Sequence, residues 1–417
     1  MWQTAAALIV DDAGGLAQLC PQITMDIITT TSTLRALCVE LAKDSFVAVD
    51  TEFMREQTYW PELCLVQIAG SKLEAIIDPL APDIDLEPFF ALMANASVLK
   101  VFHAARQDVE IVFHRSGIIP TPMFDTQIAA MVCGFGDQVS YEQIVRKLAK
   151  AQIDKSSRFT DWARRPLSEK QLAYALSDVT HLRTVYEKLK VELDTSGREP
   201  WLEEEMGILS SPETYIMNPA ESWRRIKLRL RSRKQLAVLM SVAAWREREA
   251  QSRNVPRSRV IKDDAIAEIA TQIPSSQDSL AELRALPKGY AKSRIGDAIL
   301  AAVKSGLEID HKALPQLDGR PEELTDSAQA AAEVLKLALK IVSETEGIAP
   351  KLIASSADIE AIAANDFAPV PLMSGWRRGL FGDVALELKS GRAVIGFKKG
   401  RAQILRDASA PGLEAAE

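Results

Sequence analysis

Residues 46–53, which read FVAVDTEF, join a short apolar run to two acidic residues, Asp50 and Glu52. A run of this composition predicts a buried strand. Side chains alternate between the two faces of a strand, so both carboxylates would point to one spot. Two like charges held together are unfavourable unless a cation lies between them. The stretch therefore predicts a strand that ends either in a solvated turn or in a cation-binding pair of carboxylates.

Three further apolar runs extend this strand into a domain. They cover residues 63–69, 75–78 and 98–103, and the turn-like Gly70-Ser71 separates the first two. Helical patterns dominate from there to Leu189. Strands followed by alternating helix and strand are typical of an α/β or α+β domain, which we expect to end near residue 195.

Two more positions could supply reactive side chains. Asp108 follows the fourth strand at the start of a helical pattern, where a helix N-terminus favours negative charge. Tyr174 and Asp178 are four residues apart on a later helix, so their side chains would share one face. Taken alone, the first is an ordinary first-turn acid and the second an ordinary packed tyrosine beside a surface aspartate.

The formal net charge of −7 conceals a strongly basic segment. Between Trp223 and Lys262 there are thirteen Lys or Arg and two Glu, a local balance of +11, which leaves −18 for the rest of the chain. Such asymmetry indicates either a nucleic-acid partner or a solvated basic helix.

Cysteine usage and hydropathy exclude several classes of protein. The four cysteines lie far apart without a C-x-x-C pair, which argues against a disulfide scaffold and a zinc cluster. No apolar stretch is long enough to span a membrane, and the N-terminus lacks the basic region of a signal peptide. We therefore expect a cytoplasmic protein with no membrane partner and no organic cofactor.

Beyond residue 200 the chain has helical periodicity and a weak internal repeat. Gly289-Tyr290 recurs as Gly375-Trp376, and the segment 315–321, which begins and ends with proline, would join the two copies. We predict five segments: an extension (1–24), an α/β domain (25–200), two small helical domains (212–308 and 320–403) and a tail (404–417).

Together, Asp50, Glu52, Asp108, Tyr174 and Asp178 resemble the three exonuclease motifs of the DEDD superfamily, and the tyrosine matches its DEDDy branch. Residues 49–53, 59–68 and 124–127 look like the ribonuclease D family, which the resemblance follows over roughly residues 25 to 400. It implies an RNase H-like mixed β-sheet flanked by helices, followed by two small all-α HRDC-type domains. It also makes residues 1–24 an extension upstream of the family's usual start.

The resemblance further implies 3′–5′ hydrolysis that releases one nucleoside 5′-monophosphate at a time, with two divalent ions, Mg²⁺ or Mn²⁺, held by carboxylates. Asp50 would bridge both ions, Glu52 would help to fix them, Asp178 would complete the site that activates the nucleophile, and Asp108 would hold the leaving-group ion. Tyr174 would orient the attacking water, because a phenol with a pKa near 10 is a poor base at pH 7. The expected partner is RNA with a free 3′ end, with precursor tRNA the expected substrate, and we expect a monomer.

Other residues are expected near the RNA or are set aside. The family context and the basic segment together suggest these RNA contacts: Phe53, Met54, Tyr59, Arg158, Arg229, Arg231 and Arg233. Asp125 is expected to be a helix N-cap rather than a metal ligand, and His103 to be packed or solvated. A DNA 3′–5′ exonuclease of the same superfamily and an inactive RNA-binding scaffold remain alternatives. The scaffold would be expected to lack one of the acids, and none is missing.

Overall fold

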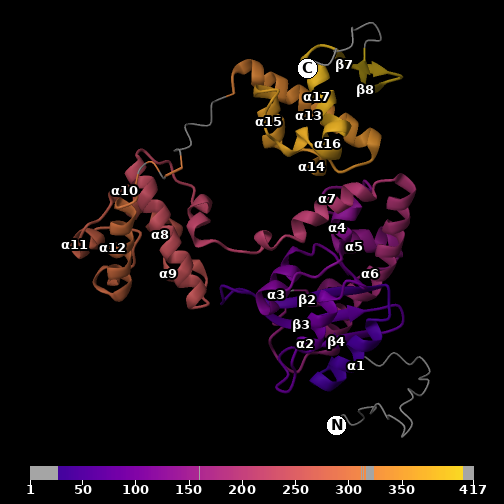
Figure 1. Cartoon of the computed structure of the whole chain (residues 1–417), viewed down its shortest axis with the longest axis horizontal. Coiled ribbons are helices and arrows are strands. Elements are labelled where there is room, and N and C mark those ends of the chain that lie inside the picture. The colour runs from indigo at the N-terminus through magenta and orange to yellow at the C-terminus, as the bar shows by residue number, and fades with distance from the viewer. Residues whose placement is uncertain (1–26, 159, 311, 313, 316–323, 407–417) are drawn as a thin grey trace.

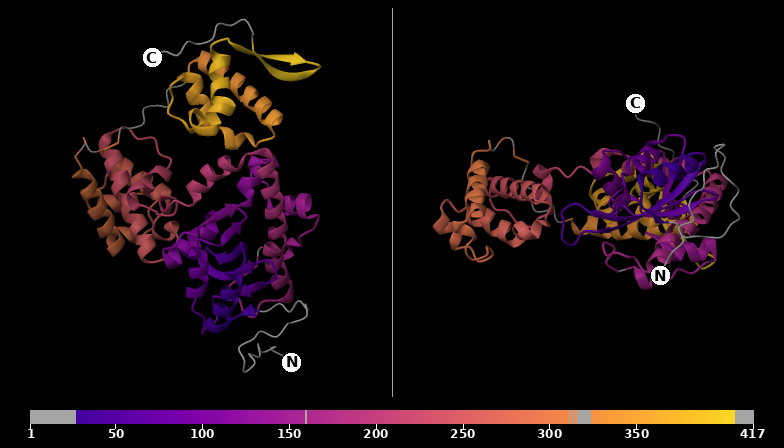
Figure 2. Two further views of the ribbon diagram at one scale, coloured as in Figure 1. Left: turned by 45° about the vertical axis from the view of Figure 1, so that its right-hand side comes forward. Right: turned by 90° about the horizontal axis from the view of Figure 1, so that it is seen from below.

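The computed structural model describes residues 27–158, 160–310, 312, 314–315 and 324–406. The predicted extension 1–24 lies outside these residues. Of the predicted tail 404–417, residues 404–406 belong to a strand and the rest lies outside the described residues. The described chain has three bodies, each with its own core (Figures 1 and 2). We call them the sheet body (27–215), the first helical body (219–310) and the second helical body (324–406). The domain boundaries drawn from the sequence remain predictions.

The sheet body contains a six-stranded mixed sheet with the order β1-β4-β3-β2-β5-β6. β2 runs antiparallel to β3 and parallel to β5, so its first half lies inside the sheet, where Val47–Val49 are buried on both faces. This mixed sheet confirms the predicted α/β class. Sequence periodicity missed β1 and β6 because they have only two and three residues. The strands are β1 (Ile27–Ile28), β2 (Phe46–Met54), β3 (Glu62–Ala69), β4 (Glu74–Ile77), β5 (Leu99–Phe102) and β6 (Met123–Asp125).

Helix α6 is the element that brings a distant part of the chain onto this sheet. It runs over Glu169–Ser196 and contacts β2, β3 and β4. A capping box between Ser168 and Gln171 begins the helix, and Gly197, in the left-handed region with φ 66°, ends it. The other helices of this body are α1 (Thr31–Leu41), α2 (Glu87–Ala94), α3 (Arg106–Ser116), α4 (Thr126–Val132), α5 (Tyr141–Ile144) and α7 (Glu199–Leu209).

The two helical bodies follow α7. The first consists of α8 (Arg233–Ser252), α9 (Arg257–Val260), α10 (Asp263–Gln272), α11 (Gln277–Ala281) and α12 (Arg294–Leu307). The second consists of α13 (Asp326–Glu346), α14 (Pro350–Ile353), α15 (Ser356–Ala364), α16 (Gly375–Arg377), α17 (Asp383–Lys389), β7 (Ala393–Lys398) and β8 (Arg401–Arg406). The helical character of this region matches the expectation, but the β7–β8 hairpin at its end was not predicted.

The first helical body contacts the loop that joins β2 to β3. In that loop Tyr59 is buried, and its hydroxyl donates to the carboxylate of Glu247 on α8, which is 1% exposed. Arg257 on α9 donates to the same carboxylate at 2.6 Å and to the Tyr59 hydroxyl at 2.9 Å. Asn254 Oδ1 accepts the backbone N–H groups of Tyr59 and Trp60 at 3.2 and 3.0 Å. We call this set of contacts the interbody latch.

The second helical body contacts the sheet body at α4 and α7. Trp201 of α7 and Trp376 of α16 stack with ring centroids 4.9 Å apart. Arg377 donates to Glu204 at 2.6 Å, and the backbone N–H of Ala349 donates to the carbonyl of Met131 at 3.0 Å. Each helical body is therefore attached to the sheet body by its own contacts.

Within the described part of the chain, no helix combines the length and the apolar character that crossing a bilayer would require.

Candidate active site

The acidic pair lies on the part of β2 that extends past β5. Pairing with β5 covers Phe46–Ala48, whereas pairing with β3 continues through Met54, so Asp50 and Glu52 lie beside an open edge. Their side chains share one face, as the period of two predicts. Thr51 points to the other face, where its hydroxyl donates to the carboxylate of Asp108 at 2.5 Å. The start of α3 is thereby fixed to the same strand.

Helix α6 supplies the third carboxylate. One ligand oxygen each from Asp50, Glu52 and Asp178 lies within 4.8 Å of the others. The three line a pocket of about 280 Å³, and Tyr174, His103 and Arg158 lie on its wall or rim. Oxygen-only ligands that converge in this way fit hard divalent cations. The donor set therefore suits Mg²⁺ or Mn²⁺.

Burial and mutual repulsion raise the pKa values of these carboxyls. Burial, together with the charges of the neighbouring carboxylates, raises the pKa of Glu52 to about 9. Burial also raises the pKa of Asp178 to about 7, although a hydrogen bond from Tyr174 and the charge of Arg158 lower it. For Asp50, burial and the charge of Asp178 hold the pKa well above its ordinary range. Without a cation the cluster binds protons, and a cation would have to displace them.

Asp108 lies next to the cluster but not within it. Its side chain is buried, and burial and the charge of Asp50 raise its pKa. Its carboxylate is nevertheless outside the group of three whose oxygens converge. The bond from Thr51 holds it at the border of the site, where a second cation or a bridging water would be within its reach.

Tyr174 and Tyr141 complete the polar wall of the pocket. The Tyr174 ring stacks on buried Trp162 at 6.2 Å between centroids. Burial and the charge of Asp178 raise the pKa of Tyr174, so its phenol stays protonated at neutral pH. The hydroxyl of Tyr141 donates to the backbone carbonyl of Asp178 at 2.6 Å. That bond fixes the turn of α6 that carries Asp178.

Two residues near the acids, His103 and Gln67, have no role predicted from the sequence. His103 lines the pocket, and its Nδ1 lies 2.9 Å from the hydroxyl of Thr126. Gln67 is opposite Asp50 in the β2–β3 pair, so the two side chains emerge on one face. Gln67 is fully buried, and neither polar atom of its side chain has a partner among the described residues. Only the strand register, which periodicity does not provide, could have identified it.

The RNA contacts expected from the sequence lie in three different settings. Phe53 and Met54 pack against the core of the sheet body, beside the acidic pair. Arg158 is at the pocket, where its charge lowers the pKa of Glu52. Tyr59 does not line the pocket; its hydroxyl bonds to Glu247 and Arg257 in the interbody latch. The expectation that it cradles substrate has no support in this placement.

The three arginines of the basic segment also differ from one another. Arg229 and Arg231 are exposed, whereas Arg233 is half-buried and donates to the carbonyl of Leu314 at 3.0 Å. Asp125 is confirmed as an N-cap, because it accepts from the backbone N–H of Gln127 at 2.7 Å. It also accepts from two backbone N–H groups at the start of α3, those of Ala104 and Ala105.

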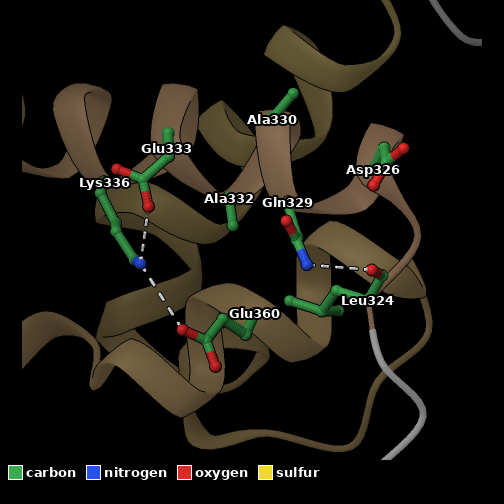
Figure 3. A pocket seen from close by; sticks show the side chains of 8 residues that line it. All are labelled: Leu324, Asp326, Gln329, Ala330, Ala332, Glu333, Lys336 and Glu360. Carbon is green, nitrogen blue, oxygen red and sulfur yellow. Dashed lines mark hydrogen bonds and ion pairs between the residues drawn. The ribbon is translucent and has the colours of Figure 1, made fainter.

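A larger hollow of about 500 Å³ lies between α13 and α15 of the second helical body (Figure 3). Its one basic side chain, Lys336, is shared between Glu333 at 2.9 Å and Glu360 at 3.5 Å. Gln329 donates to the carbonyl of Leu324. Lys336 and Gln329 thus already have hydrogen-bond partners within the hollow, so the acid pocket on the sheet body is the better candidate for catalysis.

Comparisons with known proteins agree with this geometry. A family model described as 3′-5′ exonuclease matches residues 25–194, and one described as HRDC domain matches residues 235–303. Ribonuclease D of Nitrobacter hamburgensis is 52% identical over 377 residues, which cover 90% of this chain and 98% of the relative. Ribonuclease D of Bartonella henselae is 47% identical, covering 89% of this chain and 91% of the relative. The crystal structure of Escherichia coli RNase D, described as an exoribonuclease involved in structured RNA processing, aligns with a TM-score of 0.77 at 31% identity. That alignment covers 88% of this chain and 99% of that one.

Proposed function

The chain belongs to the ribonuclease D family of 3′–5′ exoribonucleases, and we propose that it trims the 3′ ends of precursor tRNA and other structured RNAs, one nucleoside 5′-monophosphate at a time. The observation that carries the mechanism is the convergence of Asp50, Glu52 and Asp178 within 4.8 Å at an open pocket. We further propose that the protein acts as a cytoplasmic monomer.

The carboxylates are proposed to hold two divalent ions, Mg²⁺ or Mn²⁺. Asp50 and Glu52 on β2 and Asp178 on α6 would hold these ions, and Asp50 is proposed to contact both of them. Asp108, at the border, would serve the second ion, partly through water. When bound, such ions neutralise phosphoryl oxygens, lower the pKa of a bound water and stabilise the leaving oxygen. The protein's task is to fix these ligands on a rigid strand and a rigid helix.

Tyr174 is proposed to orient the attacking water. Its raised pKa rules it out as a base at neutral pH, but its protonated hydroxyl reaches the carboxyl of Asp178. The Trp162 ring, 6.2 Å away between centroids, packs beside the tyrosine ring and limits its movement. A donor held in place in this way aligns a nucleophile without accepting its proton.

The substrate strand is proposed to enter along the rim. Arg158 is close enough to the cluster to lower the pKa of two of its carboxyls, so it could contact a scissile or adjacent phosphate. Phe53 and Met54, beside the acids, would contact the terminal nucleotides. Arg229 and Arg231 in the basic segment are proposed to bind phosphates farther upstream.

The test of hydrolysis compares matched RNA and DNA oligomers with free 3′ ends in Mg²⁺, in Mn²⁺ and in a chelator. We expect metal-dependent release of 5′-mononucleotides from RNA, and none from an oligomer whose 3′ end is blocked. Preferential degradation of DNA would overturn the assignment of substrate. The finer proposal on tRNA needs a second comparison, between a precursor with a 3′ trailer and the mature transcript. We expect the trailer to be removed and the folded tRNA to be spared.

A further inference from the structure

The hairpin at the end of the second helical body is a regular two-stranded unit. β7 and β8 pair antiparallel from Ala393↔Arg406 to Lys398↔Arg401. The two turn residues, Lys399 and Gly400, both have positive φ, 52° and 76°. That is the conformation of a type I′ turn, whose twist matches that of the strands it joins.

The base of the hairpin is fixed to the body. Ala393 is buried, and Ile395 and its cross-strand partner Ile404 pack against the core of the second helical body. Arg406 forms an ion pair with Glu387 of α17 at 2.7 Å. A two-stranded hairpin alone is marginally stable in water. Here the packed base supplies the support.

Beyond the base, the hairpin exposes large apolar side chains. Phe397 continues the face of Ile395 past the core and is 80% exposed, and Val394 on the opposite face is 54% exposed. Figure 1 and the left view of Figure 2 show the hairpin projecting from the end of this body that is farther from the six-stranded sheet. An aromatic ring held out on a supported strand contributes little to the fold.

The same segment is purely basic. Residues 391–406 contain five Lys or Arg and no Asp or Glu, in a chain whose formal net charge is −7. At the tip, Lys398, Lys399 and Arg401 are exposed and make no ion pair with any residue that the structure describes. Lys398 and Arg401 are cross-strand partners, and like charges placed opposite each other destabilise a sheet. An anionic partner would remove this repulsion.

We propose that the β7–β8 hairpin binds single-stranded RNA upstream of the 3′ end that is being degraded. Phosphates would contact Lys398, Lys399 and Arg401, and a base would stack on Phe397. Basic side chains that follow the backbone, together with an exposed aromatic face, are the usual means of binding single strands without sequence preference. This inference rests on the exoribonuclease activity of the chain and adds a contact surface outside the acid pocket and the basic segment 223–262.

Charge argues for RNA over a second copy of the chain. The outer edges of both strands are open to pairing, but an edge-to-edge dimer would bring two basic hairpins together. Because the hairpin projects at the far end of its body, only an RNA long enough to extend there could contact it. The effect should therefore depend on the length of the RNA.

The first experiment neutralises the tip in the full-length protein with Lys398→Gln, Lys399→Asn and Arg401→Gln. Asparagine is chosen because it tolerates the positive φ of the turn. Binding to a long unstructured RNA is measured by fluorescence anisotropy over a salt series, in a chelator so that no hydrolysis occurs. The slope of log K against log salt should become shallower by roughly two, since each phosphate contact on a single strand contributes about 0.7.

A second variant, Phe397→Ala, should weaken the same binding roughly tenfold, because stacking on an aromatic ring is lost. Since Phe397 is mostly exposed, this change should leave the melting temperature unchanged. The charge control is a triple Lys→Gln variant at three exposed positions elsewhere: Lys43, Lys72 and Lys351. We expect the control to keep the wild-type slope.

Turnover of a short oligomer separates this inference from the proposed function. Both hairpin variants should degrade a short single strand at the wild-type rate, and the wild type should release mononucleotides from it. An unchanged salt slope in the triple variant would overturn RNA binding by the hairpin. Equal loss in the control, or loss of a dimer in sedimentation without loss of RNA affinity, would also overturn it.

Discussion

Binding of divalent metal should release protons, and the number released should depend on pH. In the metal-free protein the pKa of Glu52 is about 9 and that of Asp178 about 7. At pH 7 the first carboxyl is therefore protonated and the second is half protonated. From these two carboxyls alone a cation would displace about one and a half protons at pH 7, about two at pH 6 and about one at pH 8. Asp50, whose pKa is also raised, would add to that number.

The linkage sets the change in affinity. The slope of log K against pH equals the number of protons released, so the apparent affinity should rise at least about a thousandfold from pH 6 to pH 8. The stability of the metal-free fold changes with pH in the opposite direction. A carboxyl whose pKa is raised in the folded state destabilises that state as pH rises from the unfolded pKa, near 4.5, toward the folded value. The metal-free protein should therefore lose stability with rising pH, and added metal should restore it.

Isothermal titration calorimetry measures the release directly. Mg²⁺ or Mn²⁺ is titrated at pH 6, 7 and 8, in two buffers at each pH that differ in ionisation enthalpy. The matched control is Glu52→Gln, which should release about one proton fewer at pH 7, because the amide has no group that titrates in this range. A pH-independent affinity with no proton release would refute the reasoning, since the carboxyls would then be ionised before metal arrives.

The remaining predictions concern single side chains. Asp50→Asn should abolish nearly all turnover and weaken metal binding. Tyr174→Phe should keep its metal affinity in calorimetry but slow single-turnover hydrolysis roughly a hundredfold. An unchanged rate in Tyr174→Phe would remove the tyrosine from the mechanism. Glu247→Gln should lower the free energy of unfolding by about 3 kcal/mol, because it breaks an ion pair whose carboxylate is buried. The control Glu249→Gln, at a partly exposed ion pair, should stay within about 0.5 kcal/mol of wild type in denaturant melts. Arg229→Gln with Arg231→Gln should make the salt slope for long RNA shallower by about 1.4 without changing the rate on a short oligomer. Asp125→Asn should remain active, because asparagine also caps helices; loss of metal binding would contradict its role as a cap.

Local periodicity was sufficient to predict parts of the site. The alternation of a strand places Asp50 and Glu52 on one face, and the turn of a helix places Tyr174 one turn before Asp178. That β2 and α6 would meet depends on packing between segments more than 100 residues apart. From the sequence, only the resemblance to the family indicated that the carboxylates of β2 and α6 lie in one site.

The expectation for Tyr59 and the absence of the hairpin from the prediction have a common cause. Tyr59 follows the first motif closely, yet its hydroxyl is fixed by Glu247, 188 positions away in the sequence. The hairpin directly follows the helical repeat, and strands of six residues are too short to stand out from a helical pattern in the sequence. The position of Tyr59 depends on a long-range contact and the hairpin depends on its turn, and the local hydrophobic pattern shows neither.

The separate attachment of the two helical bodies has a consequence for the integrity of the chain. The interbody latch at Glu247 holds the first helical body to the sheet body, and the stack of Trp201 on Trp376 holds the second helical body to it. The two helical bodies are therefore both held to the sheet body without the covalent connection through residues 310–325. Cutting that connection would leave two polypeptides still bound to each other. The two pieces, expressed separately, should reassemble into a working enzyme.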